Sequence, residues 1–121
     1  GKQERTFIYI DDGIEALVKI IANKDGLATK RIFNIGNPTA GISIRGLAEL
    51  LITLIKTYPK YASLADKVQL IDTPAKEYYG EGYQDVLRRV PSIKNAKQYL
   101  NWEPKTDLVT ALKKTLDFHL L

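Results

Sequence analysis

The feature that most constrains the fold of this chain is the alternation of short, β-rich apolar runs with segments of helical periodicity. The β-rich runs are Thr6–Ile10, Arg31–Ile35 and Val68–Asp72, with a very short extended piece at Ile42–Ile44. Such alternation predicts an α/β fold. The expected order is strand, helix, strand, short strand, helix, strand, loop and two helices. Few short strands and about four helices are expected, so the chain on its own would be an α+β fold.

The first helical segment follows the first β-rich run directly. Its apolar side chains recur at i, i+3, i+4 and i+7, the spacing of one helical face: Ile14, Leu17, Val18 and Ile21. Asp12 is a predicted N-cap, because Glu15 follows three residues later at the spacing of a capping box. The pair Asp25-Gly26 predicts the end of this helix.

Three further helices are expected, at about 44–56, 93–100 and 107–119. Ser43 is the predicted cap of the first of them. Ser92, just after Pro91, is the predicted cap of the second. The segment Tyr58–Lys67 is predicted to be a loop.

Composition and charge exclude several classes of protein. The length of 121 residues predicts a single domain, and the net charge of +4 permits an anionic ligand. The basic residues are scattered, so nucleic acid is not indicated. The chain has no cysteine, which excludes disulfides and thiolate metal sites and is compatible with the expected cytoplasmic location. No apolar run approaches the roughly 20 residues that span a membrane.

The stretch YYGEGYQDVLRRVPS, Tyr78 to Ser92, combines three tyrosines, two glycines and an arginine pair. Arginine side chains can bind a phosphate or carboxylate at two points. Tyrosine rings can stack on a base or sugar and also donate a hydrogen bond. Glycines allow close approach of the backbone to a ligand. The stretch therefore suits a site for an anion and a sugar, although half-buried packing and solvated arginines would give the same pattern.

Other chemistry-bearing residues have simpler explanations. Arg5 can be a strand-edge arginine that faces water, and Asp11 with Asp12 is better explained by a helix cap and a turn than by acid-base catalysis. His119, the single histidine, is expected at the surface near a helix C-terminus. The sequence has no P-loop, no dinucleotide-type glycine loop, no metal-ligand spacing and no nucleophile elbow.

Several motifs together resemble a known family. They are RTFIYIDDGIEAL, RIFNIGNP, the helix start R-x-P-S-I-x-N-A and L-N-W-E-P-K. These motifs are similar to the C-terminal third of extended short-chain dehydrogenase/reductases, the NAD-dependent epimerase/dehydratase family acting on nucleotide sugars. With YYGxGYQDVxxR added, the resemblance is closer to the UDP-glucuronate decarboxylase domain of bifunctional polymyxin-resistance proteins. It covers essentially all of the chain.

The resemblance implies an activity for a longer parent protein. Such an enzyme uses NAD to oxidise C4 of UDP-glucuronate, and the resulting β-keto acid loses carbon dioxide to give a UDP-4-keto-pentose. The product serves the modification of lipid A with aminoarabinose. By the same resemblance, Arg89 is a catalytic residue beside the substrate, with the role of proton donor in decarboxylation, and Tyr83 and Arg5 contact the UDP-sugar. Because a guanidinium is a poor acid at neutral pH, we expect Arg89 mainly to position the carboxylate and to stabilise enolate charge. A UDP-xylose synthase, a 4-epimerase and a non-catalytic binding module remain alternatives.

The resemblance also implies what this chain lacks. The NAD-binding loop and the Tyr-x-x-x-Lys pair precede this region in such proteins, so the expected partners are a Rossmann portion and, in a bifunctional protein, a formyltransferase domain. The chain contains no methionine, and we expect it to be a piece of a longer protein. Alone it should neither bind NAD tightly nor turn over. We also expect self-association through exposed strand edges.

Overall fold

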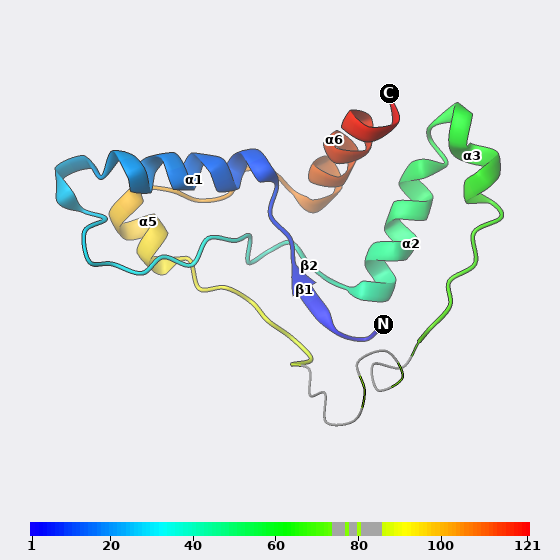
Figure 1. Cartoon of the computed structure of the whole chain (residues 1–121), viewed down its shortest axis with the longest axis horizontal. Helices are drawn as coiled ribbons and strands as arrows, with labels where there is room; N and C mark the ends of the chain where they lie inside the picture. The colour runs from blue at the N-terminus through cyan, green and yellow to red at the C-terminus, as the bar shows by residue number, and fades with distance from the viewer. Residues whose placement is uncertain (74–76, 78–79, 81–85) are drawn as a thin grey trace. The chain divides into compact units, whose positions relative to one another are not determined.

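The computed structural model describes residues 1–73, 77, 80 and 86–121 (Figure 1). In these residues two short strands and five α-helices follow one another along the chain, which confirms an α/β fold with few strands. The elements are β1 (Glu4–Thr6), α1 (Ile10–Ala22), the 3-10 turn η1 (Lys24–Gly26), β2 (Gly41–Ser43), α2 (Ile44–Ile55), α3 (Pro59–Ala65), α5 (Lys94–Leu100) and α6 (Leu108–Leu120).

The chain divides into two compact units. Unit 1 comprises residues 1–5 and 42–89, and unit 2 comprises residues 6–41 and 90–121. Each unit therefore combines segments that are far apart in the sequence.

The two-stranded sheet is smaller than the sequence suggests. It pairs β1 with β2. The predicted strand at Thr6–Ile10 is wrong in its bounds, because β1 ends at Thr6 and α1 begins at Ile10. The predicted strands at Arg31–Ile35 and Val68–Asp72 are not strands in this structure. A strand needs a neighbouring strand that pairs with its backbone, and neither segment has one among the described residues.

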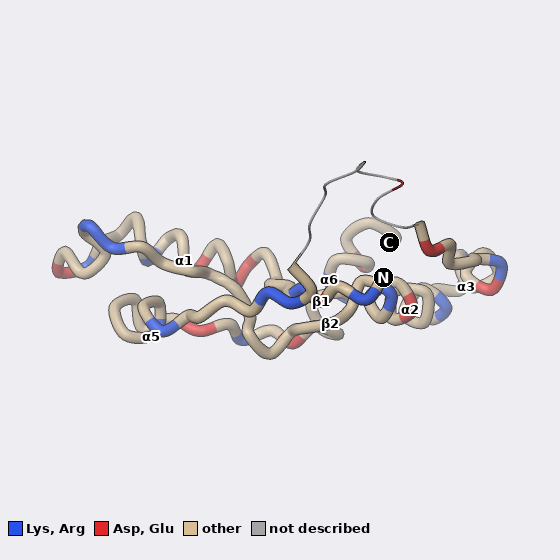
Figure 2. Tube along the Cα trace, turned by 90° about the horizontal axis from the view of Figure 1, so that it is seen from below, with Lys and Arg blue, Asp and Glu red and all other residues tan. Residues whose placement is uncertain are grey.

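The core of unit 2 lies between α1 and α5, which pack side by side (Figure 1). Ala16 of α1 and Ala96 of α5 are fully buried, and such small side chains let two helix backbones approach closely. The core also contains Ile93, Leu100 and Trp102. Acidic residues occupy the first turn of α1 and Lys19 its last turn, which complements the helix dipole (Figure 2).

Asp12 is not the cap of α1. The N-cap is Tyr9, so Asp12 lies within the first turn and the predicted capping box with Glu15 is wrong. The Asp12 side chain is buried, and its Oδ2 accepts hydrogen bonds from the backbone N–H groups of Lys105 (3.1 Å) and Thr106 (2.9 Å). The Trp102 indole donates to the Asp12 carbonyl at 3.0 Å. Asp12 thus fastens the loop before α6 to the start of α1.

Unit 1 is built around α2 and α3, which contact one another. The predicted cap of α2 is confirmed, since the Ser43 hydroxyl accepts a hydrogen bond from the Gly46 N–H at 3.0 Å. The first two N–H groups of α2 have no partner within the helix and bond to the N-terminal segment instead. The Ile44 N–H donates to the Gln3 carbonyl and the Arg45 N–H to the Gly1 carbonyl.

Two local predictions in the later helices are wrong. The segment Tyr58–Lys67 is not a loop, because α3 forms within it and starts at Pro59, a residue well suited to a first helical turn. Ser92 is not a cap, since α5 starts at Lys94 with Ile93 before it. At α6 the Asp107 carboxylate caps the helix by accepting from the Thr110 N–H at 2.9 Å.

Candidate functional site

The first candidate site lies in unit 1, where β1 meets residues 86–89. The Glu4 N–H donates to the Leu87 carbonyl at 2.7 Å, and Glu4 and Arg88 form a parallel β-bridge. The Arg5 guanidinium donates from Nη1 to the Val86 carbonyl at 2.9 Å and to the carbonyl of Glu4 at 2.8 Å. These bonds join two segments that are about eighty positions apart in the sequence. We call this arrangement the arginine clasp.

The two adjacent arginines of the clasp differ in their partners. Arg88 forms an ion pair with Glu4, with 3.2 Å between Nε and Oε2, and its side chain is 72% exposed. Arg88 is therefore exposed to solvent, and its charge is balanced by Glu4. Arg89 is also exposed.

The three predicted site residues have different outcomes. Arg5 is half-buried on β1, and its bond to Val86 places it next to the segment that ends in Arg89. The structure thus brings the neighbourhoods of Arg5 and Arg89 together. The predicted Tyr83 contact falls outside the described residues. Arginine side chains of this kind can bind phosphate or carboxylate groups.

Unit 1 also contains a small pocket whose arginine is paired with neighbouring carboxylates. Its volume is about 270 Å³, and it is lined by Gly1, Ile44, Arg45, Ala48, Leu70, Ile71, Asp72 and Thr73. Arg45 forms an ion pair with Asp72, which raises the pKa of the Arg45 guanidinium and lowers the pKa of the Asp72 carboxyl. Arg45 also pairs with Glu49 at 3.6 Å. Because Arg45 is already paired with two carboxylates, this pocket is poorly suited to an anionic ligand.

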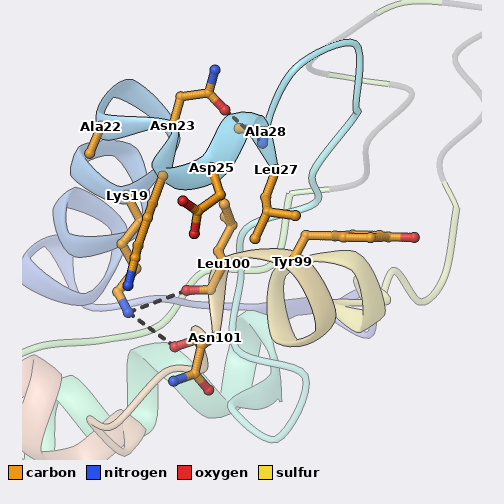
Figure 3. Close-up of a pocket in the computed structure, with 10 residues that line it drawn as sticks. Lys19, Ala22, Asn23, Asp25, Leu27, Ala28, Tyr99, Leu100 and Asn101 are labelled. Carbon is orange, nitrogen blue, oxygen red and sulfur yellow. Dashed lines mark hydrogen bonds between the residues drawn. The ribbon is translucent and has the colours of Figure 1, made fainter.

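The larger pocket, of about 440 Å³, lies in unit 2 at the C-terminal ends of α1 and α5 (Figure 3). Helix C-termini present unpaired carbonyls and favour a cation. Lys19 supplies that cation, because its ammonium donates to the Leu100 carbonyl at 3.3 Å and to the Asn101 carbonyl at 3.0 Å. Asn23 and Asn101 close the two helices in left-handed conformations. The pocket is therefore explained by helix capping, a role of Lys19 that local sequence patterns do not reveal.

The described part of the chain also bears on metal binding, membrane spans and the single histidine. There, no group of three or more His, Cys, Asp or Glu side chains could hold a metal ion. None of the described helices is both long and apolar enough to cross a membrane. His119 is exposed in the last turn of α6, as predicted.

Comparison with known proteins gives this geometry a context. Residues 1–36 match the model of the NAD dependent epimerase/dehydratase family. That match includes β1, and so the Arg5 side of the arginine clasp.

Two solved structures resemble nearly the whole chain. The PbgP3 protein from Burkholderia pseudomallei is 40% identical, with a TM-score of 0.83 over 97% of this chain and 31% of that protein. The UDP-glucose 4-epimerase of the hyperthermophilic eubacterium Thermotoga maritima, solved with UDP-glucose, is 27% identical, with a TM-score of 0.67 over 98% of this chain and 32% of that protein. This chain therefore spans about a third of the length of each. It is similar in sequence to the NAD-dependent epimerase/dehydratase family and in fold to one part of a nucleotide-sugar epimerase.

Proposed function

We propose that this chain is the C-terminal, substrate-binding part of a larger NAD-dependent enzyme that modifies nucleotide sugars. The observation that carries the proposal is the arginine clasp, which holds Arg5 beside the segment that ends in Arg89. The similarity to PbgP3 over 97% of the chain supports it, as does the family match of residues 1–36.

The cofactor is assigned to another part of the parent protein. A dinucleotide site joins a strand directly to a helix through a glycine-rich turn whose amides contact the pyrophosphate. In this chain β1 passes to α1 through Phe7, Ile8 and Tyr9, none of which is glycine. The other strand, β2, ends at Ser43 directly before the first residue of α2, so it has no glycine-rich turn there either. Neither connection fits the pyrophosphate of NAD, and we propose that this chain contributes to the substrate side alone.

For the reaction we propose oxidative decarboxylation of UDP-glucuronate to a UDP-4-keto-pentose, as in decarboxylases of the ArnA type. The loop motif YYGxGYQDV supports this choice over an epimerase. In such a reaction Arg89 would position the carboxylate of the sugar, and its guanidinium would stabilise the enolate charge that develops as carbon dioxide leaves. Arginine suits electrostatic stabilisation better than proton donation, because a guanidinium stays protonated at neutral pH. The product would serve lipid A modification and polymyxin resistance.

Within the same parent we assign diphosphate contact to Arg5 and sugar contact to Tyr83. Arg5 is on β1 and already bonds the Val86 carbonyl, so a diphosphate would meet a side chain whose position is fixed. Preorganised donors of this kind lose little conformational freedom when a ligand binds.

A second function of the same class is favoured by one observation. The Thermotoga protein, whose fold matches 98% of this chain, is a UDP-glucose 4-epimerase. An epimerase would return its hydride to the sugar, so it would show no net formation of NADH. Its substrate would also carry no carboxylate for Arg89.

The deciding experiment incubates the full-length protein that contains this chain with NAD and either UDP-glucuronate or UDP-glucose. Release of carbon dioxide and formation of NADH from UDP-glucuronate are expected, with no conversion of UDP-glucose. Conversion of UDP-glucose to its 4-epimer without NADH would replace the proposal by the epimerase.

Neighbouring arginines provide a matched pair of variants for this assay. Arg89→Ala should lower kcat by about 100-fold or more, the loss typical of removing one preorganised electrostatic group. Arg88→Ala should change kcat less than about fivefold, because Arg88 pairs with Glu4 in an exposed position. Equal losses for both variants would contradict a specific role for Arg89.

A further inference from the structure

Helix α1 has two apolar faces. One is buried against α5 and contains Ala16, which is fully buried. The other is exposed and consists of Ile10, Ile14, Leu17, Val18 and Ile21, whose residues are 64%, 49%, 54%, 58% and 83% accessible. These positions follow one another at i, i+4, i+7, i+8 and i+11, so they form one continuous stripe along the helix. We call it the α1 stripe.

Charged residues of α1 are turned away from the stripe. Glu15 pairs with Lys105 at 2.8 Å, and Lys19 donates to the carbonyls at the end of α5. Asp12 is buried and accepts hydrogen bonds from the loop before α6. Asp11, in the first turn, is the charged residue that borders the stripe. The stripe itself therefore contains no group that requires contact with water.

A row of five exposed aliphatic side chains is unusual for a soluble protein surface. Single exposed apolar residues need no explanation, but a contiguous patch marks an interaction site. An amphipathic helix normally has its polar residues opposite its buried face. In α1 the side opposite the α5 contact is apolar, which indicates a second covering layer.

We propose that the α1 stripe is the surface on which the remaining part of the parent polypeptide docks, through an apolar face of its own. The inference rests on the proposed function, in which this chain is one part of a larger enzyme. The length of the solved relatives supports this occupant. They match 97% and 98% of this chain while this chain covers only 31% and 32% of theirs, so most of each relative lies outside the matched region.

A second observation in unit 2 agrees with the same occupant. The segment Arg31–Ile35 has the composition of a strand but forms no β-ladder among the described residues, and Ile32 is 84% exposed. The Asn95 side-chain amide donates to the Ile32 carbonyl at 3.0 Å. A β-sheet in the remaining part of the parent polypeptide could pair with this segment, and the elements packed on that sheet could cover the α1 stripe.

The test uses thiol accessibility, because this chain has no cysteine of its own. Leu17→Cys and, as a second stripe position, Ile21→Cys are introduced separately. Leu64→Cys in α3 is the matched control, since Leu64 is 58% exposed and Leu17 is 54% exposed. Each variant is made in the 121-residue chain and in the full-length protein. The rate of alkylation at the new cysteine is followed by peptide mass spectrometry, so other cysteines do not interfere.

In the 121-residue chain all three thiols should react at similar rates. In the full-length protein the two stripe thiols should react about 100-fold more slowly, as expected when labelling requires local opening. The control thiol should react within about threefold of its rate in the short chain. Stripe thiols that stay fully reactive in the full-length protein would overturn the inference. Protection in the short chain that increases with its concentration would also overturn it, in favour of a second copy.

These outcomes are independent of the proposed reaction. Protected stripe thiols in a full-length protein that does not decarboxylate UDP-glucuronate would reject the reaction and keep the docking surface. Reactive stripe thiols in an active decarboxylase would reject the docking surface alone.

Discussion

Replacing Asp12 by alanine tests the most buried charged contact of unit 2. The variant loses two hydrogen bonds from backbone N–H groups to Oδ2, at 3.1 and 2.9 Å. Hydrogen bonds to a charged group contribute roughly 1.5–3 kcal/mol each. Since both share one oxygen, we expect a loss of about 3 kcal/mol in the free energy of unfolding, a large fraction of the roughly 5–15 kcal/mol of a typical domain.

The assay is urea unfolding of the 121-residue chain, followed by the fluorescence of Trp102. This residue is the single tryptophan and is 2% exposed, so its emission reports unit 2. With a denaturant slope of about 2 kcal/mol per molar, Asp12→Ala should lower the urea midpoint by about 1.5 M. The indole bonds to the main-chain carbonyl of Asp12, which the substitution leaves in place.

Two further variants separate the causes. Asp12→Asn keeps an acceptor oxygen and loses only the charge, so it should cost about 1 kcal/mol. Asp11→Ala, one position away and exposed, loses the same interaction with the helix dipole and should cost less than about 0.5 kcal/mol. If Asp12→Ala were no more destabilising than Asp11→Ala, the bonds to residues 105 and 106 would not be a major source of stability.

Three further predictions concern a side chain of the proposed site, a helix cap and a close backbone contact. Arg89→Lys in the full-length enzyme should lower kcat at least tenfold, since a single ammonium cannot bind a carboxylate at two points; near-wild-type turnover would rule out a need for guanidinium geometry. Hydrogen bonds from Thr110 lower the pKa of Asp107 below its ordinary 3.8. Ionised Asp107 therefore contributes its full stabilisation above pH 3.8, and this contribution is lost as the pH falls through the lower pKa of the folded state. In melting curves, the stability difference between wild type and Asp107→Asn should shrink only below pH 3.8. Gly36→Ala should lower the melting temperature by an amount equivalent to about 1–3 kcal/mol, because the new Cβ would lie 2.7 Å from Cγ of Pro91; an unchanged melting temperature would show that the Pro91 ring can move aside.

The helices could be read from the sequence better than the strands. Helical periodicity and the cap at Ser43 depend on residues within one or two turns, and this cap is confirmed. The cap at Asp107 is equally local, although Asp107 is predicted only as the start of a helix. The segments Arg31–Ile35 and Val68–Asp72 have strand composition, but a strand forms only where a partner supplies the ladder. Propensity alone cannot provide that partner.

In the site, too, contacts between residues far apart in the sequence could not be predicted. Asp12 has the spacing of a capping box, yet its carboxylate bonds to amides more than ninety positions away. Similarly, the roles that we propose for Arg5 and Arg89 come from resemblance, whereas the bond from Arg5 to Val86 could not be predicted in that way. Contacts between distant segments are set by tertiary packing, which single-sequence patterns do not encode.

The bonds from the N-terminal residues to α2 have a practical consequence for how this chain can be trimmed. Removing Gly1 to Gln3 would take away the carbonyls that accept the Ile44 and Arg45 N–H groups, while the Ser43 cap would remain. A protease or an expression boundary that deletes three residues would therefore act on a helix more than forty positions downstream. Gly1 and Gln3 thus complete the N-terminal hydrogen bonding of α2. Affinity tags are therefore best placed at the C-terminus of the chain.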